Sequence, residues 1–205
     1  MLLKNYWETK RVTEQSGYIT LSTSVSASNP SGLMTAMKTL AGDDFGYLWS
    51  FKTSENIGGY SNLSPYASAQ LGPFNAAIMN YYVPETMGFR VGTGSTPVSI
   101  DDYKLDTDVT SSFSDRKCTT EFSSEDGHMI ITETWVGTNN TDSDIIITEV
   151  GILNRFLSVV NPTSGVTANG NSSAKAVLLL RKVLETPILV PAGHTATITI
   201  RIDES

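Results

Sequence analysis

The clearest pattern along the chain is an alternation of apolar and polar positions over residues 195–202. Every second residue there is alanine or isoleucine, and the residues between them are threonines and Arg201. Alternation of this kind in β-branched residues predicts a strand with one buried and one exposed face. Pro191 and Gly193 come just before it and predict a turn. We therefore expect this part of the chain to be β structure.

The second half of the chain contains further strand patterns separated by turns. Within residues 128–136, Glu133 shares one face with Ile131 and Trp135, and the Asp126-Gly127 dipeptide before them is typical of a hairpin turn. Other predicted strands are residues 88–91, 119–123, 145–152 and 177–184, and residues 161–174 form a predicted Ser/Asn/Gly-rich loop. Short strands joined by turns predict an all-β fold, with a β-sandwich or jelly-roll-like domain over residues 87–205.

The first part of the chain is more mixed. Residues 17–26 and 47–51 alternate as strands do, the second with aromatic side chains. Residues 33–40 carry apolar side chains at helical spacing, with Ser31 as a candidate N-cap and Gly42 as a stop. This spacing predicts one short helix. We expect residues 1–86 to form a loop-rich region distinct from the β domain.

Residues 54–86 form a long stretch that is poor in charge and rich in glycine, serine, asparagine, proline and tyrosine. Loops of this length in compact domains are usually functional, bound to a partner or flexible. We interpret this stretch as an extended arm or interface loop. It makes residues 1–86 a candidate assembly region.

Composition narrows the possible functions. Hydrophobic residues make up 40% of the chain, enough for a core, and the net charge is −7. An acidic chain without a clustered basic patch argues against a nucleic-acid partner, since phosphate binding needs grouped lysine and arginine. No window approaches the roughly 20 apolar residues of a membrane helix, and no signal-peptide stretch is seen at the start. We expect a soluble protein made in a cytoplasm, without a membrane partner.

No segment of the sequence predicts a catalytic or metal site. The Gly92-Thr93-Gly94 turn lacks both the third glycine of a dinucleotide loop and the lysine of a P-loop, so it predicts turn chemistry that leads into one helical turn. The single Cys118 offers neither a disulfide framework nor zinc spacing. The two histidines, His128 and His194, flank strand turns, and no further ligands are spaced around them. We expect no enzyme activity, no cofactor and no metal.

One acidic segment allows two interpretations. Asp101, Asp102, Asp106 and Asp108 lie close together in the sequence. The sixth-position glycine and closing glutamate of a calcium loop are absent, which favours a solvated acidic turn over a cation site.

Three segments taken together resemble a class of tailed-bacteriophage virion proteins. They are the glycine turn with its Asp-Tyr-Lys-Leu continuation in residues 90–105, the Thr-Glu-Val-Gly-Ile strand in residues 146–153, and the Leu-Leu-Arg segment in residues 177–193 with the strand that follows it. Their order resembles that of the family, and they span roughly half of the chain. The resemblance implies a β-sandwich structural protein of a phage particle without catalytic activity.

This resemblance implies partners as well as a fold. We expect a capsid-associated role, as a decoration or minor head protein that is assembled in the host cytoplasm as a homo-oligomer beside the major capsid protein. A tail, collar or baseplate position, with head–tail or tail proteins as partners, is the alternative, and a carbohydrate-binding module for host recognition is the alternative of another class. Aromatic side chains dominate interface hot spots, so we predict these interface anchors: Tyr60, Tyr66, Phe74, Tyr81 and Tyr82.

Overall fold

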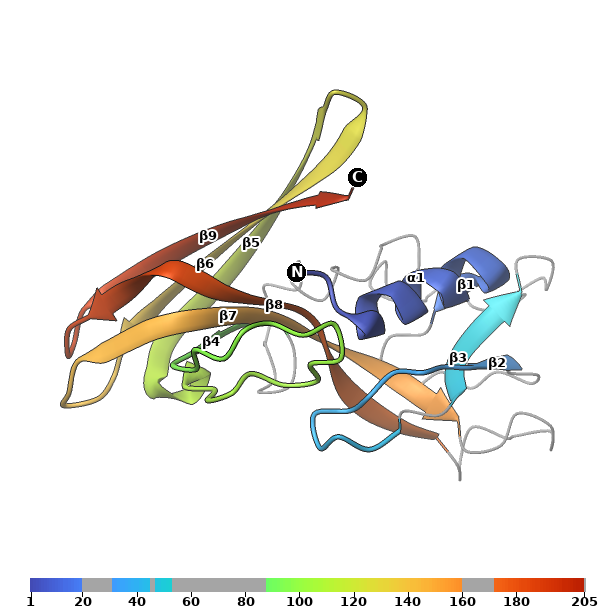
Figure 1. The fold of residues 1–205 in the computed structure, drawn as a ribbon, viewed down its shortest axis with the longest axis horizontal. Helices are drawn as coiled ribbons and strands as arrows, with labels where there is room; N and C mark the ends of the chain where they lie inside the picture. The colour runs from blue at the N-terminus through green and yellow to red at the C-terminus, as the bar shows by residue number, and fades with distance from the viewer. Residues whose placement is uncertain (20–30, 45–46, 53–87, 160–171, 205) are drawn as a thin grey trace.

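The computed structural model describes residues 1–19, 31–44, 47–52, 88–159 and 172–204. Most of the described chain is β-strand, arranged in two antiparallel sheets with one α-helix (Figure 1). The α-helix is α1 (Lys4–Ser16), and one turn of 3₁₀ helix, η3 (Thr110–Ser112), precedes β5. The first sheet contains β1 (Gly17–Ile19), β2 (Ser31–Met34), β3 (Tyr47–Lys52), β4 (Gly88–Gly92), β7 (Ile145–Val159) and β8 (Ser172–Val190). The second contains β5 (Phe113–Glu125), β6 (His128–Asn139) and β9 (Thr195–Glu204).

The long strand β7 organises the first sheet. It pairs with β8 along one edge, while β4 and then β3 pair with the other edge at successive positions. Strands β1 and β2 pair with β3 and extend the sheet beyond it. In the second sheet β6 is the central strand between β5 and β9. The prediction of an all-β fold with one short helix is therefore confirmed at this level.

The two sheets share one buried core. Phe89 of β4 stacks on Trp135 of β6 with ring centroids 6.1 Å apart, and Phe113 of β5 packs edge-on against the same indole at 5.2 Å. The contact of Phe89 with Trp135 joins the first sheet to the second, and Phe113 packs on this indole from within the second sheet. The core continues through the apolar faces of the remaining strands with Val91, Ile131, Ile147, Val150, Ile152, Val177, Leu179, Ala196, Ile198, Ile200 and Ile202.

Several predictions from alternation are confirmed. The apolar positions of β9 are at most 6% exposed, and the threonines between them face solvent. Asp126 and Gly127 join β5 to β6, and both have positive φ angles, of 49° and 82°. That backbone twist matches the twist of the flanking strands in a tight hairpin. Strands β3 and β4 also form where the alternation predicts them.

The predicted helix over residues 33–40 is wrong. Residues 31–34 are strand β2, because each of them pairs with a residue of β3 in an antiparallel ladder. The helix of the structure is α1, which buries Asn5, Tyr6 and Thr9 on one face. Two of those three side chains are polar, so an apolar periodicity does not detect this helix.

The described part of residues 1–52 supplies β1, β2 and β3 to the first sheet, and the start of the chain packs against β8 of that sheet. Leu3 and Tyr6 are fully buried, and the Asn5 amide donates to the carbonyl oxygens of Lys38 and Leu178, both at 3.0 Å. Asn5 Oδ1 also accepts a bond from Lys38 N at 2.9 Å. One polar side chain thus links α1, the segment after β2 and β8. The expected domain boundary near residue 86 lies outside the described residues and stays a prediction.

No helix among the described residues is long and apolar enough to cross a membrane.

Candidate functional site

The most distinctive polar site in the described structure surrounds Arg181 in the middle of β8. This side chain is 1% exposed and meets three carboxylates. Its Nε donates to Glu149 Oε2, its Nη1 to Asp102 Oδ2, and its Nη2 lies against Asp106 Oδ2, each at 2.8 Å. We call these four residues the Arg181 network.

Strand pairing places the first ion pair of the network. Gly151 of β7 lies opposite Arg181 of β8, and Glu149 lies two residues further along β7. Arg181 and Glu149 are therefore diagonal neighbours on one face of the sheet, which is within reach of long side chains. Glu149 is fully buried, and its carboxylate would be costly there without the guanidinium.

Glu149 also anchors the loop that follows β4. Its Oε1 accepts bonds from the backbone N–H groups of Gly94 at 3.1 Å and Thr107 at 3.0 Å. Thr148 Oγ1 donates to the carbonyl of Gly94 at 2.7 Å. One carboxylate thus holds both ends of the loop over residues 94–107 against β7.

Both glycines of the Gly-Thr-Gly turn are explained by close packing. A Cβ atom on Gly92 would lie 2.6 Å from Glu149 Oε1. A Cβ atom on Gly94 would lie 2.3 Å from the Cβ of Asp106 and 2.5 Å from Glu149 Oε1. Real Cβ atoms do not approach other heavy atoms so closely, so the turn needs glycine at both places. The turn binds a side chain of its own protein, in agreement with the sequence argument against a phosphate loop.

The aspartates complete the network from the loop side. Asp102 Oδ2 accepts a bond from Ser99 N at 3.0 Å, and Asp106 Oδ2 accepts bonds from the Thr96 hydroxyl and from Thr96 N. The Thr96 hydroxyl and, more weakly, Arg181 lower the pKa of Asp106 below its ordinary value. Burial disfavours the charged guanidinium, but hydrogen bonds to Asp102 and Glu149 outweigh it and raise the pKa of Arg181.

The acidic segment therefore needs a correction. A solvated acidic turn is incomplete for Asp102 and Asp106, because both bind Arg181, although Asp106 is also exposed to solvent. It holds for Asp101, which is exposed and lies 3.6 Å from Lys4 Nζ. The predicted turn is present over residues 99–102, but no helix forms there.

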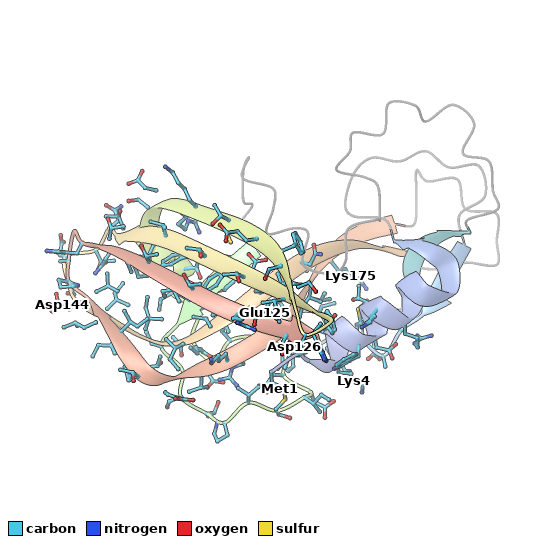
Figure 2. All side chains as sticks on the ribbon, turned by 90° about the horizontal axis from the view of Figure 1, so that it is seen from above. Met1, Lys4, Glu125, Asp126, Asp144 and Lys175 are labelled. Atoms are coloured by element: carbon cyan, nitrogen blue, oxygen red, sulfur yellow. The ribbon has the colours of Figure 1, made fainter. Side chains whose placement is uncertain are left out.

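The two histidines are not brought together. His128 begins β6, whereas Asn139 at the other end of β6 donates its N–H to the carbonyl of His194. At about 3.3 Å per residue the two ends of this strand are roughly 36 Å apart. Asp126 comes two residues before His128, and Asp144 accepts a bond from the N–H of Ala192, two residues before His194. Figure 2 labels these two aspartates, and they lie well apart. Among the described residues no group of three potential ligands could hold a metal ion.

A second buried polar cluster lies in the β5–β6 ladder. Glu133 is fully buried, and both of its oxygens accept from the Thr120 hydroxyl at 2.9 Å. Cys118 Sγ donates to Glu133 Oε2 at 3.3 Å. Burial raises the pKa of Glu133 to about 7, although these two hydrogen bonds act in the opposite direction. Burial and the neighbouring Glu133 also raise the pKa of the Cys118 thiol, which makes it a poor nucleophile.

Sequence reasoning missed both clusters, yet each left a signal. Arg181 and Glu149 are charged residues inside largely apolar segments predicted to be strands, and Glu133 shares one face of its predicted strand with Ile131 and Trp135. A charge at such a position implies a partner. The predicted interface residues Tyr60, Tyr66, Phe74, Tyr81 and Tyr82 lie outside the described residues and stay a prediction.

Comparison with protein-family models, with curated proteins and with solved structures finds no match for this chain. The functional conclusion rests on the residues of the chain itself.

Replacing Gly94 with alanine is expected to lower the free energy of unfolding by about 2 kcal/mol, the usual cost of forcing a methyl group into a packed site. The new Cβ would have to displace Asp106 and Glu149 together. Urea unfolding measures the change. Gly193→Ala is the control. A Cβ atom at Gly193 would meet no atom within 4 Å, so a loss of stability there comes from its positive φ of 73° and not from packing. Equal losses in the two variants would contradict the packing role of Gly94.

Proposed function

We propose that this chain is a non-enzymatic structural protein of a tailed-bacteriophage particle, built as a β-sandwich and attached to the capsid as a decoration or minor head protein. The observation that supports this proposal is the Arg181 network. The three segments of the resemblance, residues 90–105, 146–153 and 177–193, supply Asp102, Glu149 and Arg181. Motifs separated by many residues in the sequence thus meet at one point of the fold.

The chemistry of the Arg181 network supports a structural role over a catalytic one. Every carboxylate of the network is bound to Arg181, and Glu149 and Asp102 also accept bonds from backbone N–H groups. A general acid or base must instead be free to exchange a proton with a substrate near neutral pH. The charges of the network hold the loop over residues 94–107 against β7 and β8. A protein that binds its partners through the shape of its surface requires such a fixed loop.

A glycan-binding module is less well supported by the described residues. Such a module would present neighbouring exposed aromatic rings as a platform. Among the residues whose side chains the structure describes, the large exposed aromatic side chains are Trp7 on α1 and Phe122 on β5. The two residues belong to different elements, and α1 and β5 lie apart in Figure 1.

The test uses particles of the phage whose genome encodes this chain. Its gene is deleted and supplied from a plasmid, and purified particles are separated into heads and tails. The parent chain is expected with the heads, at a fixed copy number relative to the major capsid protein by quantitative mass spectrometry. Absence from particles would overturn the proposed function, and recovery with tails would overturn the capsid location.

Substitution to alanine of the predicted anchors in residues 54–86 then tests the assembly region. Incorporation is expected to fall while the unfolding midpoint stays unchanged. Phe122→Ala is the matched control, since this phenyl ring is 55% exposed in the described structure and lies outside the predicted region. Deletion of residues 1–86 is unsuitable, because it would remove the buried side chains of Leu3 and Tyr6. Normal incorporation of the alanine variant would refute the assignment of this segment.

A further inference from the structure

The edges of the two sheets differ in how well their backbone groups are protected. An open strand edge presents unpaired N–H and C=O groups, and natural proteins cover such edges or interrupt them with bulges, proline or charge. The free edge of β4 is covered by the chain that follows it, since Thr93 N donates to Thr107 O and Val109 N to Val91 O. This edge is closed to a further strand.

The outer edge of β8 is protected in two ways. Residues 1–3 pair with its middle, where Leu3 N donates to Leu179 O and Arg181 N to Met1 O. Further along, the pairing with β7 jumps from Val183 to Ile188, so residues 184–187, Pro187 among them, interrupt the ladder. A proline and an irregular register both prevent another strand from adding here.

The outer edge of β5 is protected by a bulge and by charge. Its register shifts between Ser114 and Lys117, and Asp115 inside the bulge has a φ of 50°. Exposed charged side chains follow along the strand, among them Lys117 and Glu121. This edge is both bent and charged.

The edge of β9 has no covering chain among the described residues, no bulge and no proline, and its charged residues Arg201, Asp203 and Glu204 lie at one end. Its register with β6 is unbroken from Thr195 opposite Thr138 to Glu204 opposite Met129. The strand contains neither proline nor glycine, and its first charge is Arg201. Among the described strands it pairs with β6 alone, and Figure 1 shows it as the border of the second sheet.

We infer that the outer edge of β9 pairs with the same edge of a second copy of this chain, antiparallel across a two-fold axis. The pairing joins two three-stranded sheets into one continuous sheet, and each edge supplies the hydrogen-bonding groups that the other lacks.

The side chains of β9 favour a copy of itself as the partner. On its exposed face the second sheet already carries paired threonines, with Oγ1 atoms 3.1 Å apart between Thr134 and Thr199 and 2.9 Å apart between Thr138 and Thr195. Antiparallel pairing about Thr199 extends this row across the seam, since opposite residues point to the same face. The apolar face of β9 meets its own equivalent in the same way.

Charge excludes two registers. Pairing centred on Arg201 or Asp203 would oppose like charges directly, which destabilises a ladder. Pairing centred on Thr199 overlaps residues 195–203 and places Arg201 opposite Thr197 and Asp203 opposite Thr195. One positive and one negative residue in the overlap cancel, so this edge is neutral in a chain of net charge −7. The inference does not depend on the proposed virion role.

Sedimentation equilibrium of the purified full chain tests the pairing. The parent is expected to form dimers with rising concentration. Thr199→Lys would place two lysines opposite each other at the two-fold axis, and its dimer dissociation constant is expected to rise at least tenfold. Thr119→Lys, the same change at an exposed threonine of β5, is the matched control and is expected to associate like the parent. A monomeric parent, or equal effects of both lysines, would overturn the inference.

A cysteine variant tests the register. Thr199→Cys is expected to form a covalent dimer on mild oxidation, because opposed residues in a hydrogen-bonded pair have Cα atoms about 5.5 Å apart, within disulfide reach. The native Cys118 is buried and does not compete. Thr119→Cys is the control for random collision. Cross-linking of the two variants at the same rate would contradict a two-fold axis at Thr199.

Discussion

Replacing Arg181 with methionine is expected to lower the free energy of unfolding by about 4 kcal/mol, the size found when one partner of a buried ion pair is removed. Methionine can fill the space of the aliphatic stem, but it leaves three carboxylates facing one another. Glu149 is fully buried and cannot turn to water. Urea unfolding gives the free energy, and hydrogen exchange of residues 94–107 should rise with it, since Glu149 holds both ends of that loop.

Two further variants separate charge from packing. Arg181→Met combined with Glu149→Gln is expected to be more stable than Arg181→Met alone, because the amide oxygen can still accept from the backbone of Gly94 and Thr107. Arg201→Met removes an exposed arginine paired with Glu125 and is expected to leave the stability nearly unchanged. If Arg181→Met were as stable as the parent, the network would not stabilise the fold.

Local pattern was sufficient to predict the strands whose two faces differ. In β9 the isoleucines are buried and the threonines are exposed, and in the β5–β6 hairpin Asp126 and Gly127 adopt the positive φ angles that the turn requires. These features depend on residues close in the sequence. In a strand with one buried and one solvent-exposed face, apolar and polar residues alternate with a period of two, whichever element packs against the buried face.

The helices show where local pattern fails. The apolar spacing over residues 33–40 suits a helix, but tertiary pairing with β3 makes its first part a strand. The real helix α1 buries the polar residues Asn5 and Thr9, whose bonds to distant or helical backbone replace apolar contact. Helical propensity is weak enough for tertiary contacts to override it.

The Arg181 network could be predicted in part. Arg181 in the largely apolar segment 177–184 and Glu149 in the segment 146–152 each imply a buried partner of opposite charge. The two segments are consecutive predicted strands, so each residue is the candidate partner of the other. Asp102 and Asp106 come from a loop, and which loop reaches the strand depends on packing of the whole chain. The sequence therefore does not show that this loop meets the two strands at Arg181, and the structure does.

The second large expected effect concerns the pH dependence of stability. The pKa of Glu133 is about 7 in the folded chain, against an ordinary value of 4.5. Between these values the folded state keeps a proton that the unfolded state has released, so stability falls as pH rises through this window. At about 1.4 kcal/mol per pH unit, the loss attributable to Glu133 is about 3 kcal/mol by pH 8.

Glu133→Gln isolates this contribution, because the amide resembles the protonated carboxyl and does not titrate. Urea unfolding from pH 4.5 to 8 is expected to show that the variant gains stability relative to the parent as pH rises. Asp106, whose pKa is lowered, changes stability below this window and affects parent and variant alike. Glu121→Gln, the same change at an exposed glutamate of β5, is the matched control, and the gain of Glu133→Gln with rising pH is expected to exceed that of the control. Equal pH dependence of the two variants would show that the buried carboxyl of Glu133 does not titrate in this range.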